Sequence, residues 1–157
     1  MNYRDQIIQL ATRKFELDID GHHGLPHWQR VEVNGLALAP HTGADVDVVR
    51  HFAWLHDACR LDEDADPDHG QRAAAWAERL YMDGRIDLPI NEMGLLYRAI
   101  RDHNKGRTSD DPTIGTCWDA DRLDLFRVGV TPAERFFSTD AAKYLLQHKL
   151  KELKELA

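Results

Sequence analysis

The chain has 157 residues, which is long enough for one domain with a sizeable hydrophobic core. Its net charge of −7 argues against general affinity for nucleic acid or acidic membranes, but not against a small anionic substrate. No apolar run approaches the roughly 20 residues of a membrane span, and the first residues lack the apolar segment of a signal peptide. The two cysteines form no CxxC motif. We therefore expect a cytoplasmic protein with reduced thiols.

Apolar residues recur with helical spacing through almost the whole chain, and sustained strand-like alternation is absent. The pattern predicts helices over about residues 2–17, 26–40, 44–60, 67–83 and 89–103, another from 112, and a last one over about 139–155. Prolines suit the first turns of several of them, and Asp66–Pro67 reads as the cap and first residue of the fourth. Thr131 is expected to cap a short helix in TPAERFF. The sequence predicts an all-α, compact bundle of six or seven helices in a single domain, 1–157.

Five of these helices each carry a histidine or aspartate on their apolar stripe. In the third, Val49, Phe52, Ala53 and His56 follow the i, i+3, i+4, i+7 spacing of a buried face. Asp57 lies about 100° further round that helix, close enough to bend toward the same point. The inward residues of the other four helices are His27, His69, His103 and Asp121.

A lone inward histidine or aspartate is more often a hydrogen-bonded core residue than a ligand. Six of them in one small domain are costly to bury, because four imidazoles cannot satisfy both ring nitrogens among aliphatic neighbours. A divalent cation held by neutral imidazoles and carboxylates removes this conflict. The pattern therefore predicts a metal site in the core.

The other histidines are interpreted differently. His41, His51 and His148 lie off the apolar stripes or in loops, and we predict that they are solvated. His22 and His23 lie in a glycine-flanked loop just before His27, where His23 in particular can enter the site as a supporting or substrate-contacting residue. The acidic run DEDADPD lacks the ligand spacing of a calcium loop and is predicted to be a solvated loop with a helix cap.

In their order, these residues resemble the HD-domain superfamily of metal-dependent phosphohydrolases, whose pattern is a histidine, a His–Asp doublet and a later aspartate. Here the three motifs are His27 in HGLPHWQRV, His56–Asp57 in WLHDACR and Asp121 in DADRLDL. The resemblance covers about residues 20–130 and implies an all-α bundle with a metal site in its core.

Some members of that superfamily hold two metals and add histidines between the doublet and the last aspartate. His69 and His103 stand where such ligands would be. The resemblance thus implies one or two divalent ions, with Asp57 bridging if there are two. It leaves the choice among Mn, Fe, Mg, Ni, Co and Zn open.

The chain departs from the members that hydrolyse guanosine alarmones, because Arg60 and Leu61 replace their Glu–Asp pair. Arg60 follows His56 by one helical turn, and its planar fork suits a phosphate. The alternative for Arg60 is a salt bridge to the acidic loop.

The resemblance therefore implies hydrolysis of a small phosphate ester, a nucleotide among the candidates, by a metal-activated water. Asp57 would bind metal and assist the water, and His69 or His23 would protonate the leaving group. Lys105 and Arg107, in the loop after His103, would join Arg60 in binding the phosphate.

Two alternatives stay open. A few HD-domain proteins with this fuller ligand set use two irons to activate oxygen, and a metal-bound domain can also sense a nucleotide without turnover. The expected partner is a small phosphorylated metabolite or a nucleotide, and no membrane or nucleic-acid polymer is expected.

Overall fold

The computed structural model describes all 157 residues and contains helices and no strand. The helices are α1 (Tyr3–Lys14), α2 (Leu25–Thr42), α3 (Val46–Leu55), α4 (His69–Met82), α5 (Ile90–Asp102), α6 (Pro112–Arg122) and α7 (Asp140–Leu156), with 3-10 helices η1 (Leu125–Val128) and η2 (Glu134–Phe136) between the last two. The predicted all-α bundle is confirmed. None of its helices combines the length and apolar character needed to cross a lipid bilayer.

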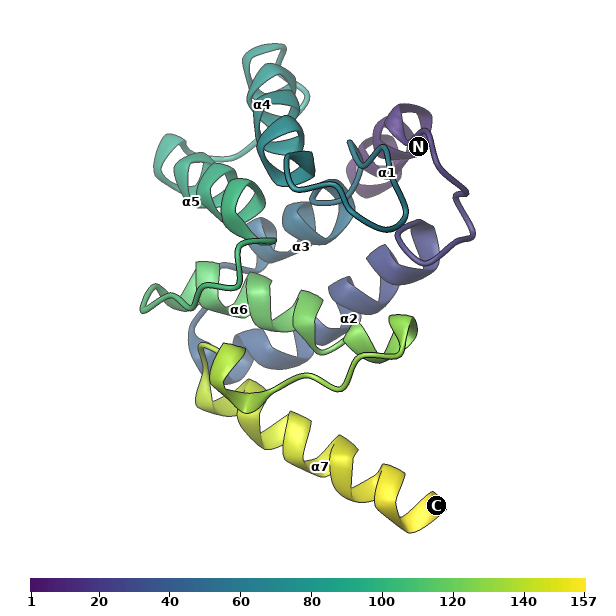
Figure 1. Cartoon of the computed structure of the whole chain (residues 1–157). Helices are drawn as coiled ribbons and strands as arrows, with labels where there is room; N and C mark the ends of the chain where they lie inside the picture. The colour runs from purple at the N-terminus through teal and green to yellow at the C-terminus, as the bar shows by residue number, and fades with distance from the viewer.

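The long helix α2 and the short helix α3 lie at the centre of the bundle (Figure 1). α6 packs against α2, α5 packs against α3, and α4 packs against α5 on the side away from the centre. All seven helices and several connections contribute to one continuous cluster of 34 buried apolar residues, so the chain has a single core. α7 lies along the edge against α2 and α6, buries only Ala142 and Leu146, and points its C-terminal end away from the bundle.

Polar caps set the starts of the helices next to the centre. The Asp45 carboxylate accepts a hydrogen bond from Val48 N (3.0 Å) at the start of α3. The Asp111 carboxylate accepts from Thr113 N and Ile114 N (both 2.9 Å), and Pro112 occupies the first position of α6, where no N–H is needed.

The predicted third helix is too long. α3 ends at Leu55, because Ala58 N donates to Leu55 O (3.2 Å) and Arg60 N donates to Asp57 O (3.1 Å), so the chain tightens into i→i−3 turns. His56 and Asp57 therefore follow the helix instead of lying within it. Arg60 therefore does not lie one helical turn after His56 on the same helix, and that prediction was wrong.

Two other predicted boundaries were also wrong. α4 begins at His69 after Asp68, and Asp66 caps nothing there, because its carboxylate accepts from Leu61 N (2.7 Å) and pairs with Arg72 (2.5 Å). The TPAERFF segment forms only the three-residue η2, preceded by Ala133 and not by Thr131.

His51 is buried, contrary to the prediction that it is solvated. Its Nδ1 donates to Asp47 O (2.6 Å) and its Nε2 accepts from the Tyr3 hydroxyl (2.7 Å). The same hydroxyl oxygen accepts from Asp87 N (2.9 Å). This chain of hydrogen bonds fastens α1 to α3 and to the connection between α4 and α5. His41 and His148 are exposed, as predicted.

Candidate metal centre

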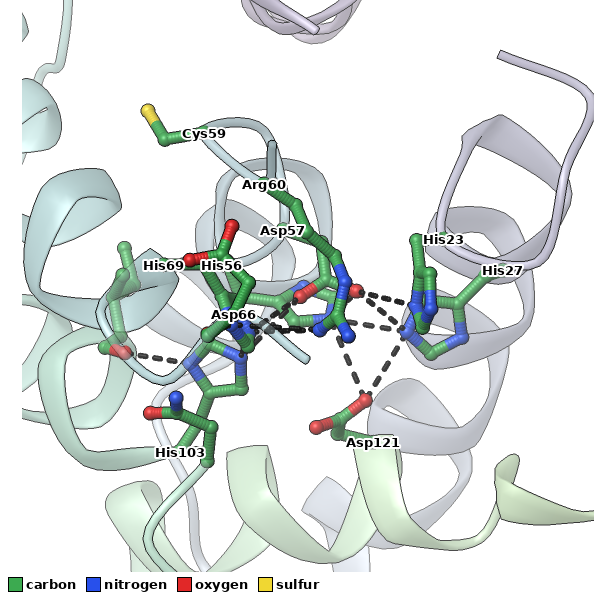
Figure 2. A network of polar contacts seen from close by, with 12 residues as sticks. His23, His27, His56, Asp57, Cys59, Arg60, Asp66, His69, His103 and Asp121 are labelled. Carbon is green, nitrogen blue, oxygen red and sulfur yellow. Dashed lines mark hydrogen bonds and ion pairs between the residues drawn. The ribbon is translucent and has the colours of Figure 1, made fainter. Parts of the chain in front are cut away.

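The six residues predicted to face one point do come together at the centre of the bundle (Figure 2). They come from five different parts of the fold: His27 from α2, His56 and Asp57 from the turn after α3, His69 from the start of α4, His103 from the end of α5 and Asp121 from α6. All are buried except Asp121, whose side chain is 16% exposed. The centre is therefore almost closed, with Asp121 on its open side.

Asp57 lies between two groups of histidines (Figure 2). Its Oδ2 is 3.5 Å from both His27 Nε2 and His56 Nε2. Its Oδ1 is 3.1 Å from His69 Nε2 and 3.4 Å from His103 Nε2. One carboxylate thus faces two neighbouring sites with different oxygens.

Asp121 completes the first of these groups. Its Oδ1 is 3.1 Å from His27 Nε2 and 3.4 Å from His56 Nε2. The ligand atoms of His56, His103 and Asp121 also lie within 4.8 Å of one another, so the two groups are contiguous. The arrangement offers four protein ligands on one side and three on the other, with Asp57 shared.

All four imidazoles are held in the same tautomer. Nδ1 of His27 lies 2.7 Å from Asp124 Oδ2, and Nδ1 of His56 lies 3.0 Å from Phe52 O. The other two Nδ1 atoms face backbone carbonyls, His69 at 2.5 Å from Asp66 O and His103 at 2.6 Å from Ile100 O. Because these oxygens only accept hydrogen bonds, Nδ1 is the donor and Nε2 carries the lone pair in each neutral ring.

These lone pairs then face one another. His27 Nε2 lies 3.1 Å from His56 Nε2, and His69 Nε2 lies 3.0 Å from His103 Nε2. Two lone pairs at this distance need a proton or a cation between them. Two ligands at about 2.1 Å from one ion and at right angles lie about 3 Å apart. The donor set therefore fits a divalent ion on each side of Asp57.

Without a bound cation, the charges of these residues shift one another's pKa values. Burial lowers the pKa of His56, but the carboxylates of Asp57 and Asp121 outweigh it and raise that pKa to about 9. Burial raises the pKa of Asp57 and of Asp121, and the facing histidines, His56 foremost, outweigh it and hold both pKa values well below the usual range. The centre thus keeps its carboxylates ionised and attracts positive charge.

Asp124 supports the centre and was missed in the sequence. Its carboxylate accepts from His27 Nδ1 through one oxygen and from Arg30 Nε (2.8 Å) through the other. Such a contact fixes the ring orientation of a metal-binding histidine. In the sequence, Asp124 could have been found from its position three residues after Asp121, because residues three apart lie on the same side of a helical turn.

An open cavity of about 750 Å³ leads to the centre. The charged side chains that line it, apart from the imidazoles, are Asp57, Arg60, Glu63, Asp64, Asp121, Arg122 and Arg127. Three guanidinium groups thus face four carboxylates, and one or two divalent ions would make the cavity positive. That charge suits an anionic ligand.

Arg60 reaches this cavity by a different route from the predicted one. Its Nε and Nη2 donate to the backbone carbonyls of Asp62 (2.8 Å) and Asp64 (3.3 Å). Its Nη1 lies 3.4 Å from both ring nitrogens of His69. The side chain therefore braces the acidic loop through backbone oxygens instead of a salt bridge, and holds Nη1 beside the centre.

His23 also lines the cavity, and its contacts differ from those of the other histidines. Its Nε2 donates to Glu63 O (2.9 Å), and its Nδ1 lies 3.7 Å from Asp57 Oδ2. Trp28 Nε1 donates to the His23 carbonyl (2.8 Å) and fixes the backbone. Arg127, which the sequence did not single out, donates to His22 O (2.6 Å) and lies 3.4 Å from His23 Nδ1. His22 is itself exposed at the cavity rim.

The structure places Lys105 and Arg107 outside the cavity lining. Both residues are exposed, and Lys105 Nζ pairs with Asp102 Oδ1 (2.9 Å). The backbone oxygen of Arg107 accepts from Arg122 Nη1 (2.5 Å). Arg122 and Arg127 line the cavity in their place.

The structure is an all-α bundle built around a buried centre of four histidines and two aspartates. The structure is similar to the crystal structure of a predicted HD superfamily hydrolase from an uncultured Thermotogales bacterium, with a TM-score of 0.76 and 26% sequence identity over 97% of this chain and 87% of that one. No protein-family model matches the sequence. No curated protein matches it either. The resemblance to the HD superfamily is confirmed at the level of the fold.

Proposed function

We propose that this protein is a metal-dependent hydrolase of phosphate esters. The observation that carries the proposal is the sharing of Asp57 between two groups of Nε2 lone pairs, each pair about 3 Å apart (3.1 and 3.0 Å). The opening of this centre into a cavity with three arginines supports an anionic substrate. The similarity to a predicted HD superfamily hydrolase supports a hydrolytic reaction.

Divalent ions bound at such a centre supply a water of lowered pKa and polarise phosphoryl oxygens. The protein's own groups orient the reaction. The Nη1 of Arg60, held beside His69, can donate to a phosphoryl oxygen as charge develops. Asp57, buried and ionised, can use a free lone pair to accept a hydrogen bond from the attacking water.

His23 is the better proposal for the proton donor to the leaving group. His69 was an alternative in the sequence, but its Nδ1 is bonded to Asp66 O and its Nε2 faces Asp57, so both nitrogens are committed. His23 Nδ1 faces the cavity, 3.7 Å from Asp57 Oδ2 and 3.4 Å from Arg127 Nη2. Because Nε2 donates to Glu63 O, Nδ1 carries a proton only in the imidazolium form, and from there that proton can reach a leaving oxygen.

The test is a hydrolysis assay of protein purified without oxygen. It uses a panel of phosphomonoesters and phosphodiesters with added Mn, Fe, Mg, Ni, Co or Zn. We expect phosphate release that depends on the metal and is lost in Asp121→Ala. Oxygen consumption without phosphate release in the iron-loaded protein would contradict the proposal in favour of an oxygenase. Ligand binding without turnover for every metal would contradict it in favour of a sensor.

A further inference from the structure

The cavity above the candidate metal centre has one apolar wall. The three hydrophobic residues that line the cavity are Leu125, Val128 and Val130, and all three belong to η1 and the turn that follows it. The acidic loop contributes Glu63 and Asp64 to the same lining. Apart from Gly106, the rest of the lining is polar or charged.

The backbone of this segment holds the wall together. Gly129 has a left-handed φ of 75°, which an L side chain rarely adopts, and ends η1. Val130 N then donates to Leu125 O (3.2 Å), so Val130 returns to the side of Leu125. This closure resembles the end of a Schellman turn, where an apolar contact often forms.

Arg127 fixes the wall to the metal centre. Its Nε donates to His22 O (2.6 Å) and its Nη1 donates to Asp124 O (3.0 Å). Asp124 in turn holds His27, and His22 precedes His23. A ligand that reaches the centre therefore meets an apolar surface whose position is set in advance, which lowers the entropy cost of binding.

The residues of the apolar wall do not belong to the hydrophobic core. Val128 is 39% exposed and Val130 is 47% exposed, and neither belongs to the buried cluster. Single exposed aliphatic residues are ordinary on protein surfaces. Val128 and Val130 are distinguished by lining the same cavity as four of the six convergent residues, Asp57, His69, His103 and Asp121. A cavity of about 750 Å³ also holds a ligand far larger than a phosphate group.

We propose that this wall binds the alcohol portion of the substrate, and that the preferred esters carry an apolar or aromatic group next to the phosphate. This inference rests on the proposed function. With the phosphoryl group at the centre beside Arg60, the rest of the ester extends into the cavity. The carboxylates of Glu63 and Asp64 disfavour a second anionic group on their side, whereas Leu125, Val128 and Val130 favour an uncharged one.

Binding of non-hydrolysable phosphonates tests the wall without turnover. The metal-loaded protein is titrated calorimetrically with methylphosphonate and with phenylphosphonate. We expect phenylphosphonate to bind roughly tenfold more tightly, the ratio for about 55 Å² of apolar surface leaving water. In a double variant, Val128→Ser with Val130→Ser, this ratio should fall below threefold while the methylphosphonate Kd stays unchanged. The matched control is Val46→Ser, 38% exposed at the start of α3 and outside the cavity lining, which should keep the full ratio.

The outcomes separate the two proposals. Equal affinities for both phosphonates in the wild type, or a ratio that the double variant leaves unchanged, would overturn the apolar wall and leave the phosphate-ester hydrolase standing. Failure of both phosphonates to bind the metal-loaded wild type would overturn the proposed function and this inference with it.

Discussion

At the scale of single residues, the tautomers of the four histidines indicate a metal centre more strongly than the presence of four histidines does. Each ring gives Nδ1 to an oxygen that can only accept and turns Nε2 toward Asp57 or Asp121. A core histidine that served packing alone would have no reason to leave Nε2 facing another lone pair. The metal-centre interpretation therefore rests on which nitrogen is committed and which is free.

Arg60 offers a test of phosphate recognition. Replacing Arg60 with Ala removes both the charge and the fork, and Lys keeps only the charge. We predict graded losses in kcat/KM, smaller for Lys, with the Ala loss about 2–4 kcal/mol of transition-state stabilisation. Metal content measured alongside should stay at the wild-type level, since Arg60 is not a ligand. An Ala variant with wild-type kcat/KM would show that Arg60 only holds the acidic loop.

His23 can be tested through the leaving group. If His23 protonates the leaving oxygen, His23→Gln should lower kcat about 10²–10⁴-fold for an alkyl phosphate. The loss should be much smaller for 4-nitrophenyl phosphate, whose leaving group departs without a proton. A structural role would instead lower both rates by the same factor. Equal losses on the two substrates would therefore rule out the assignment.

At the scale of elements, helical spacing located the helices and the inward residues better than it located the helix ends. His27 and Asp121 lie within α2 and α6, and His56 and His103 are the C-cap residues of α3 and α5, with helical backbone angles. Asp57 reaches the centre for another reason, because the chain tightens into a turn after α3. WLHDACR contains no Gly or Pro to mark that turn, although His56, Asp57 and Cys59 are weaker helix formers than Leu or Ala.

His51 makes the attachment of α1 sensitive to pH. Burial lowers the pKa of His51 below its usual 6.5, so the unfolded chain binds a proton there more readily than the folded one. The contribution of His51 to the free energy of unfolding is therefore complete above pH 6.5. It is lost as the pH falls through the lower pKa that His51 has in the folded protein. We predict that the wild type loses more thermal stability between pH 7.5 and 5.5 than His51→Gln, whose amide can bond without titrating.

The measurement for that prediction is the melting temperature of both proteins at the two pH values, with amide exchange of α1 alongside. Since burial also lowers the pKa of His103, the wild type alone does not isolate His51, and the variant supplies the reference. Parallel changes in the two proteins would show that the hydrogen-bond chain through Tyr3 does not sense pH.

At the scale of the whole molecule, the fold class and the six convergent residues could be predicted because both follow from periodicity and motif order. The lining of the cavity could not be predicted in this way. Arg127 lines the cavity from η1 and Val130 from the turn after it, where the sequence has no helical periodicity. Arg122 lines it beside the loop that carries Lys105 and Arg107. In the sequence, Lys105 and Arg107 were predicted to bind phosphate from their charge alone. The direction of the loop decides which side chains face the centre.

Asp57 is proposed to join two metal sites, and the number of ions bound per chain tests this most directly. Chelator-treated protein is titrated with Mn or Zn and analysed for bound metal after desalting. We predict two ions per wild-type chain, one in His69→Ala, which retains the site of His27, His56 and Asp121, and fewer than one in Asp57→Ala, with helical circular dichroism preserved in each. Wild-type protein that binds no stoichiometric metal, or an Asp57→Ala variant that binds as much as the wild type, would contradict the account.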